Sequence, residues 1–377
     1  MTHEETQRAA PVPFLAPTVP PVEALVADYR AIVASGIFSN GGRMDRELVA
    51  AVEAWVGGCA FATTMCNCTA GIELAVRLTF LERPRALVPA FTFAAGPLTL
   101  ISAGYTPEFI DVEASSWQPS LEEARELLER SPREYAGILL AATFGVANER
   151  VAEWEALATE YELPLVIDSA AGFGAEYASG ERLGARGTCE VFSIHATKMV
   201  GAGEGGLLTS RDPDLIALLN QAKNFGFGSE RASVRWGTNA KLPELTAALA
   251  LRQLDVLPER LVSRRAVQAE YEATLTPFGI TFQPGALRSA PAFASALMPT
   301  ADSRDAAMAA LSDELIESRM YYNPPVHRQP FFADAAPSRA LETTDDLSAR
   351  IISLPMADEL GSDVFERVAS ALGGVTT

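Results

Sequence analysis

The sequence holds few of the residues that bind metal ions or form disulfide bonds. It has three histidines (His3, His195 and His327) and four cysteines in 377 residues. A zinc site needs about four nitrogen or sulfur ligands, and small secreted domains stapled by disulfides are much richer in cysteine. Cys66 and Cys68 form a Cys-x-Cys pair, but no second cysteine pair lies near it. We therefore predict neither a metal site nor a disulfide framework.

Basic residues are also few relative to acidic ones. The chain has 30 Lys and Arg residues against 48 Asp and Glu, which gives a net charge of −18 and a pI of about 4.7. Such a chain has no overall attraction to nucleic acid or to an anionic membrane. We expect neither as a partner, although an anionic small molecule could still bind in a local pocket of basic or N–H groups.

Long apolar runs and targeting signals are missing as well. No run of about 18 apolar residues, the length of a transmembrane helix, occurs in the sequence. The first residues include Glu4 and Glu5 and lack the basic region and apolar core of a signal peptide. Together with the low cysteine content, these absences predict a cytoplasmic protein.

Short apolar runs at residues 86–89, 137–141 and 163–168 predict β-strands. The runs are continuously apolar and do not alternate with polar residues, as is typical of a parallel sheet that is covered on both faces. Between the last two runs, residues 149–161 place apolar side chains at helical spacing. The alternation of strand and helix predicts an α/β domain with a mostly parallel central sheet and right-handed crossovers.

Proline and alanine content divides the chain further. Residues 8–22 hold five prolines and predict an extended arm. Residues 243–275 are rich in Ala and Leu and predict a long helical stretch, after which prolines recur at wide intervals. We predict an N-terminal arm over 1–22, a large domain over 23–250 and a smaller C-terminal α/β domain over 251–377.

Residues 201–206 match the dinucleotide-binding pattern Gly-x-Gly-x-x-Gly. That fingerprint follows a strand and opens a helix, whereas residues 207–210 here have the composition of a strand. The context is reversed, so we predict against nicotinamide binding. The glycines instead indicate that the backbone passes close to a bulky group.

Lys198 stands in a polar turn that follows the apolar strand ending near Ile194, with glycines after it. A lysine amine attacks a carbonyl carbon only when it is neutral, and a partly desolvated site lowers its pKa enough to permit this. This segment alone fits a catalytic lysine and an ordinary surface lysine equally well.

Three further segments favour a cofactor site. Asp168 ends an apolar strand, where ligands bind in open α/β folds and where a carboxylate can face the pyridine nitrogen of pyridoxal phosphate; a turn-forming role is the alternative. Residues 67–71 open a helical pattern, so their N–H groups can cradle a phosphate, unless Thr69 simply caps the helix. An aromatic side chain of residues 91–93 can lie flat on a cofactor ring or pack in the core.

In this order along the chain, the motifs resemble the DegT/DnrJ/EryC1/StrS sugar aminotransferases, which have the type I (aspartate aminotransferase-like) fold. The resemblance extends from about Pro13 to about Leu372. The family's phosphate loop corresponds to residues 67–70, its Pro-x-x-Thr-aromatic segment to residues 89–93, and its Ser-Phe-His/Tyr-x-x-Lys motif to residues 193–198.

The resemblance implies pyridoxal phosphate as the cofactor, with Lys198 and Asp168 as the catalytic residues. Lys198 would carry the cofactor as a Schiff base, and Asp168 would face the pyridine nitrogen. In the family, the asparagine that matches Asn239 reaches the phosphate bound by the neighbouring subunit, which implies a homodimer with shared active sites. The implied cofactor-binding residues are Cys68, Thr69, Ala70, Phe93, Asp168, Ser193, Lys198 and Asn239.

The resemblance also implies a substrate. Members with a histidine at the position of His195 mostly aminate carbon 4 of a nucleotide-linked 4-keto-6-deoxy sugar. We therefore predict transamination of a nucleotide-linked keto-deoxysugar, dTDP-4-keto-6-deoxyhexose, with L-glutamate as the amino donor. His195, Tyr321 and His327 are the predicted substrate contacts, although His327 fits a polar loop residue equally well. Relatives that act as sugar dehydrases carry histidine where this chain has Lys198.

Two positions depart from the family pattern. Ala171 stands where the family has Gln or His against the ring hydroxyl, and Cys68 replaces a glycine of the phosphate loop. Three other functions stay open: transamination of a keto-cyclitol, amination at carbon 3 of a sugar, and a non-catalytic role as a sensor or assembly partner. The presence of Lys198, Asp168 and Asn239 together argues against the last.

Overall fold

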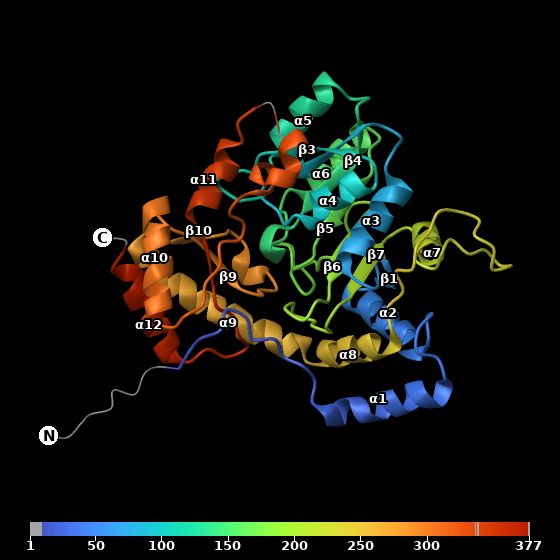
Figure 1. The fold of residues 1–377 in the computed structure, drawn as a ribbon, viewed down its shortest axis with the longest axis horizontal. Helices are drawn as coiled ribbons and strands as arrows, with labels where there is room; N and C mark the ends of the chain where they lie inside the picture. Colours follow the sequence, from blue (N-terminus) through green and yellow to red (C-terminus); the bar gives the residue numbers. More distant parts are fainter. Residues whose placement is uncertain (1–9, 336, 338, 376–377) are drawn as a thin grey trace.

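The computed structural model describes residues 10–335, 337 and 339–375 and is built around a seven-stranded sheet (Figure 1). The strand order is β1–β7–β6–β5–β4–β2–β3, and β7 runs antiparallel to both of its neighbours while the other pairs are parallel. The strands are β1 (Phe61–Met65), β2 (Arg85–Pro89), β3 (Thr106–Ile110), β4 (Tyr135–Ala141), β5 (Leu165–Asp168), β6 (Cys189–Ser193) and β7 (Gly206–Ser210).

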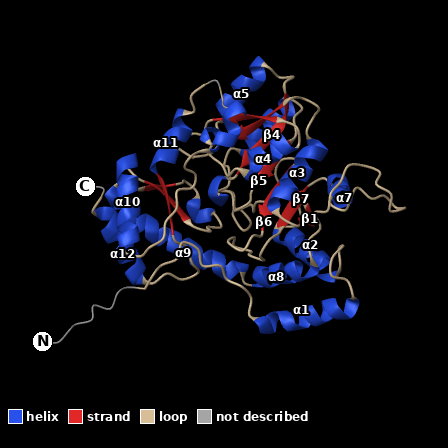
Figure 2. Ribbon diagram, viewed as in Figure 1, coloured by secondary structure: helices blue, strands red, loops and turns tan. Residues whose placement is uncertain are grey.

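Helices cover both faces of this sheet (Figure 2). Successive residues of β4 point to opposite faces, so that Ile138 joins one buried cluster and Leu139 the other. The first face carries α2 (Arg43–Trp55), α5 (Leu121–Arg130), α6 (Val151–Glu160) and α8 (Glu244–Asp255). The second carries α3 (Cys68–Thr79), α4 (Ala95–Ser102) and α7 (Pro213–Ala222). This double cover explains why the strands are continuously apolar.

A second, antiparallel sheet has the order β10–β9–β8 and its own apolar core. Its strands are β8 (Thr281–Phe282), β9 (Ala294–Leu297) and β10 (Ile351–Leu354). The helices of this part are α9 (Leu257–Leu275), α10 (Ala301–Asp313), α11 (Glu342–Arg350) and α12 (Ser362–Gly373). Short 3₁₀ helices occupy Thr143–Gly145, Thr276–Phe278, Ala286–Arg288, Val326–Arg328 and Pro330–Ala335. The predicted α/β fold class is confirmed, and the domain limits stay a prediction.

The helical stretch predicted over 243–275 is two helices. Helix α8 ends at Asp255, and α9 begins at Leu257 with Pro258 in its first turn, a position where the missing N–H of proline costs nothing. In Figure 1 the two helices follow one another across the lower part of the molecule, with α1 below α8, and α9 reaches the C-terminal sheet.

Of the arm predicted over residues 1–22, residues 1–9 lie outside the described part of the chain, and residues 10–21 run extended. Val12 forms a β-bridge with Ile316, and Leu15 forms one with Met356, so the arm lies along the C-terminal part. Helix α1 (Val22–Ser35) then packs on α8. Among the described residues, no helix has both the length and the apolar content needed to span a membrane.

The strand directions bring Asp168, Ser193 and the loop that follows β1 to one edge of the large sheet. The parallel strands β2, β4, β5 and β6 end at this edge, and β1 ends there too, because β7 is antiparallel to both β1 and β6. Gly206, the first residue of β7, pairs with Met65 on one side and Ser193 on the other. The loop after β1, the end of β6 and Asp168 of β5 therefore meet.

Candidate active site

Lys198 lies on a tight loop between β6 and β7. The loop is closed by backbone hydrogen bonds from Lys198 N to the carbonyl of His195 (2.8 Å) and from Ala202 N to the carbonyl of Ile194 (2.9 Å). The Lys198 side chain is half-buried, and loss of hydration lowers its pKa. The negative charge of Asp168 opposes this shift only in part. A lysine in this state holds a larger fraction of the neutral amine that attacks carbonyl groups.

Asp168 is buried at the end of β5, with 8% of its surface exposed. Burial raises the pKa of its carboxyl to about 6, while the N–H of Ala170 (3.0 Å to Oδ1) and the charge of Lys198 pull it down. A buried carboxylate with a single backbone partner is poised to accept a further positive donor, such as a protonated ring nitrogen. The structure thus brings together the two side chains on which the predicted chemistry depends.

The loop between β1 and α3 forms an anion cradle. Asn67 is the N-cap of α3, and its Oδ1 accepts a hydrogen bond from Ala70 N (2.8 Å). The alternative that Thr69 caps the helix is therefore wrong. Cys68 and Thr69 begin the helix, where the N–H groups have no carbonyl partner within the helix and the helix dipole favours an anion. Burial keeps the Cys68 thiol neutral, because it raises the pKa well above its ordinary value.

Gly206, the last glycine of the run at 201–206, begins β7 beside the cradle. A Cβ atom at this position would lie 2.8 Å from the carbonyl of Asn67 and 2.9 Å from the N of Cys68. Ser193, its partner on β6, is buried, and its Oγ accepts a hydrogen bond from His195 N (3.1 Å). Only glycine at position 206 lets the cradle lie this close to the sheet.

Gly206→Ala is expected to weaken cofactor binding. The added methyl group meets backbone and not a flexible side chain, and overpacking of this kind costs about 1–3 kcal/mol, or about 5- to 150-fold in affinity. Titration of the cofactor-free protein with pyridoxal phosphate, followed by absorbance, measures the change in Kd. Gly374→Ala, where the nearest atom to a Cβ lies 3.6 Å away, is the control. An unchanged Kd for Gly206→Ala is the contrary result.

Aromatic side chains cluster near Asp168. Phe93 is 61% exposed, and its ring centroid lies 6.2 Å from that of Tyr322. Tyr322 stacks on Phe144 with centroids 5.5 Å apart, and burial followed by the charge of Asp168 raises the pKa of its hydroxyl. Phe144 has a φ of 57°, uncommon for a bulky residue and found most often at functional sites. Sequence reasoning missed both Tyr322 and Phe144.

Tyr321 and the two predicted histidines lie in different surroundings. Tyr321 is half-buried, with its ring centroid 5.3 Å from that of Phe293. His195 is half-buried on the Lys198 loop, with Nδ1 2.9 Å from Thr197 Oγ1. His327 is buried with Nε2 3.1 Å from a carboxylate oxygen of Asp345, and desolvation lowers its pKa despite that charge. The structure thus gives His327 an internal partner, and the substrate roles of all three stay predictions.

Asn239 is exposed on the segment that leads into α8. Its Oδ1 accepts a hydrogen bond from Lys241 Nζ (2.6 Å), and the carbonyl of the next residue, Ala240, accepts one from Cys66 N (2.8 Å). The segment is therefore fastened to the chain that enters the phosphate loop. The predicted reach of Asn239 into a second subunit stays a prediction.

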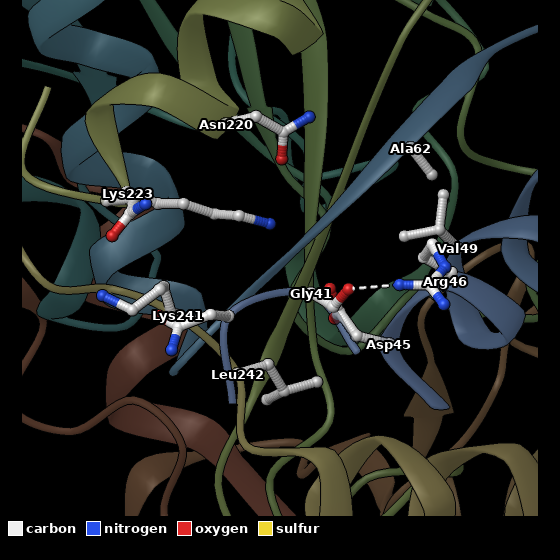
Figure 3. A pocket seen from close by; sticks show the side chains of 11 residues that line it. Gly41, Asp45, Arg46, Val49, Ala62, Asn220, Lys223, Lys241 and Leu242 are labelled. Carbon is white, nitrogen blue, oxygen red and sulfur yellow. Dashed lines mark hydrogen bonds between the residues drawn. The ribbon is translucent and has the colours of Figure 1, made fainter. Parts of the chain in front are cut away.

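A separate polar cavity of about 360 Å³ lies behind β1 (Figure 3). Lys223 Nζ donates to Thr63 Oγ1 (2.7 Å) and to the carbonyl of Thr64 (3.0 Å), and Asp45 accepts from the Thr64 hydroxyl. Figure 3 shows Lys223 and Asp45 extending toward β1 from different sides of the cavity. These two charges are used to hold the strand that ends at the phosphate loop.

The site fits pyridoxal phosphate on the chain's own features. Asn67 caps the first turn of α3, Gly206 leaves room for the cradle, and the buried Asp168 carboxylate and the desolvated Lys198 amine lie close enough to influence each other electrostatically. Among the described residues, no group of three or more His, Cys, Asp or Glu side chains is arranged to hold a metal ion. The fold and the site together define a pyridoxal-phosphate-dependent aminotransferase.

Comparison with known proteins gives the family. The chain belongs to the DegT/DnrJ/EryC1/StrS aminotransferase family, whose sequence model matches residues 22–373. It is 42% identical over 367 residues to protein Rv3402c of Mycobacterium tuberculosis, covering 96% of this chain and 89% of that protein. Its fold matches a putative PLP-dependent aminotransferase from Bacillus cereus with a TM-score of 0.91, 28% identity, and coverage of 97% and 100%. It matches DesI, solved with its TDP-sugar product, with a TM-score of 0.88, 30% identity, and coverage of 98% and 93%.

Proposed function

We propose that this enzyme transfers an amino group from L-glutamate to a nucleotide-linked keto-deoxysugar, dTDP-4-keto-6-deoxyhexose. The observation that carries the proposal is the half-buried Lys198 amine, whose pKa is lowered, beside the buried Asp168 carboxylate and the phosphate cradle. The nucleotide-sugar part is supported by the 30% identity to DesI, whose structure holds a TDP-sugar product.

Each residue of the site has a definite task in this proposal. Pyridoxal phosphate, when bound, supplies an electron sink that stabilises negative charge on the carbon next to the transferred nitrogen. Lys198 holds the cofactor and, once released, takes a proton from the donor's α-carbon and returns one on the other side of the reaction. Asp168 would keep the ring nitrogen protonated. Phe93 would cover the ring, while His195, Tyr321 and His327 would contact the substrate.

The phosphate group is assigned to the N–H groups of Cys68, Thr69 and Ala70, to Ser193, and to Asn239 of a second copy of the chain. Ala70 N already donates to Asn67, so Cys68 and Thr69 supply the freer donors. The proposal therefore includes a homodimer in the cytoplasm, and light scattering on the purified protein tests the dimer.

Absorbance spectra of the purified enzyme test the reaction one half at a time. We expect a visible band from the lysine-bound cofactor, its loss on adding L-glutamate, and its return on adding dTDP-4-keto-6-deoxyglucose. A 3-keto sugar nucleotide and a keto-cyclitol serve as competing acceptors. Return of the band with one of these alone replaces the proposed substrate, and the absence of any response to amino donors points to a non-catalytic protein.

A further inference from the structure

Buried side chains from α8 and α9 hold the backbone that follows Lys198. Arg260 Nη1 donates to the carbonyl of Met199 (2.7 Å), and Gln253 Nε2 donates to the carbonyl of Gly201 (3.0 Å). Both side chains are almost inaccessible, with 7% and 2% of their surfaces exposed. Arg260 Nη1 also donates to Gln253 Oε1 (2.8 Å), which joins the two anchors into one unit.

The same arginine is tied to the C-terminal part of the chain. Arg260 Nε lies 3.0 Å from one carboxylate oxygen of Asp358, and Arg264 Nε lies 2.7 Å from the other. Asp358 stands in the segment between β10 and α12, and the hydroxyl of Ser263 donates to its carbonyl. A buried guanidinium is costly unless it is fully paired, so the position of Asp358 governs where Arg260 can lie.

The Lys198 loop has little room to absorb a displacement. A Cβ atom at Gly201 would lie 2.6 Å from the carbonyl oxygen of Ala196, and Ala196 N donates across the loop to Gly203 (2.8 Å). A movement of the Met199 carbonyl is therefore passed along the backbone to Lys198, the residue before it. A displacement of about 1 Å in a catalytic group can cost about 100-fold in rate.

We propose that Arg260 is a positioning residue, which sets the main chain of Lys198 and couples it to the C-terminal sheet through Asp358. This inference rests on the proposed role of Lys198. In Figure 1, α9 is the helix that joins the two parts of the molecule, and Arg260 lies in its first turns. The position of the C-terminal part thus affects how the lysine amine meets its substrate, although Arg260 itself has no part in the reaction.

Arg260→Lys is the test variant, and Arg265→Lys is its matched control. Arg265 also stands on α9 and holds backbone carbonyls, those of Ser289 (3.0 Å) and Gly174 (3.1 Å), away from the Lys198 loop. We expect Arg260→Lys to lower kcat about 10- to 100-fold, with the KM for L-glutamate and the Kd for pyridoxal phosphate changed about threefold or less. Arg265→Lys is expected to keep kcat within about threefold of the unchanged enzyme.

Hydrogen–deuterium exchange on the cofactor-free protein provides a readout independent of activity. We expect faster exchange of the amides at 194–203 in Arg260→Lys and unchanged exchange there in Arg265→Lys. Asp358→Asn, which keeps the Arg260 side chain, is expected to act in the same direction with a smaller effect, and it serves if Arg260→Lys fails to fold.

The positioning role is overturned if Arg260→Lys and Arg265→Lys lose kcat equally. It is also overturned if exchange at 194–203 is unchanged in both Arg260→Lys and Asp358→Asn. Borohydride reduction of the unchanged enzyme with pyridoxal phosphate distinguishes failure of the proposed role of Lys198 from failure of the positioning role of Arg260. A label on another residue overturns the role of Lys198 itself, whereas a label on Lys198 with an unaffected loop overturns this inference alone.

Discussion

Lys198→Ala is expected to lower the rate of amino transfer by at least about 10⁴-fold, because the same amine holds the cofactor and moves the proton. The fold should persist: the lysine is half-buried in a site that disfavours its charge, so its removal relieves a cost of desolvation. Single-turnover assays with the keto sugar measure the loss, and thermal unfolding checks that Tm stays within a few degrees.

The chain offers unusually clean controls for this experiment, because it has only three lysines, Lys198, Lys223 and Lys241. Lys198→Arg keeps the positive charge but provides no neutral amine, so it should be as inactive as the alanine variant. Lys223→Arg retains a donor toward Thr63 and Thr64 and should keep near-normal activity. Peptide mapping after borohydride reduction should find the label on Lys198. Substantial turnover by Lys198→Ala, or a label on Lys223, contradicts the proposal.

The elements that position the site follow from local patterns in the sequence. Apolar runs predict β2, β4 and β5, and the rule that ligands bind at the carboxyl ends of parallel strands places Asp168 at the site. The start of α3 reaches the same edge because β7 pairs antiparallel with both β1 and β6, which no apolar run predicted. The assignment of Lys198 as a catalytic residue needed further evidence, since its own segment fits a surface lysine equally well. Its assignment came from the order of several motifs along the chain, and the structure supports it by placing Lys198 near enough to Asp168 for their charges to interact.

No sequence pattern predicts the contacts between residues that lie far apart in the chain. Arg260 meets the carbonyl of Met199 across 61 positions of the chain, and an arginine on a helix gives no sign of which carbonyl it will bind. The left-handed backbone of Phe144 likewise has no sequence signal, whereas glycine at such a position would have had one. The Asn67 cap could have been found, because asparagine directly before a helical pattern is a favoured N-cap.

His327 and Tyr322 illustrate the limit at the site itself. The two residues stand five positions apart in one segment, yet His327 turns to the carboxylate of Asp345 while Tyr322 lies against Phe93 and Phe144. Which side chain of such a segment faces the cofactor depends on how the chain packs, and composition alone does not determine it.

Asp168→Asn is expected to lower kcat by about 10²–10³-fold, the usual effect of removing one group that stabilises charge in the transition state. The amide still accepts the hydrogen bond from Ala170 N, so the side chain keeps its place. It loses the negative charge that holds a proton on the ring nitrogen. The cofactor should therefore bind but react slowly, which steady-state kinetics and absorbance spectra together can measure.

The same substitution, which lowers activity, should raise the stability of the cofactor-free protein at high pH. Burial raises the pKa of Asp168 from 3.8 to about 6, a difference that corresponds to roughly 3 kcal/mol. Because the folded-state pKa is raised, the free energy of unfolding is highest while the carboxyl is protonated and falls as the pH rises through 6. Asp168→Asn escapes this loss, so it should be more stable than the unchanged chain at pH 8 and lose that advantage toward pH 4.

Glu190→Gln is a control that distinguishes the effect of a buried carboxylate on stability from its effect on activity. Glu190 is buried on the neighbouring strand, and burial raises its pKa to about 7, but it accepts hydrogen bonds from Ser169, Gly184 and Arg186 inside the protein. Its removal should alter the pH dependence of stability in urea unfolding while activity stays within a few-fold. If Asp168→Asn behaved in the same way, with activity retained, its carboxylate would be an ordinary buried acid. If it lost activity and gained stability at pH 8, the enzyme accepts a less stable fold in order to keep a charge facing the cofactor.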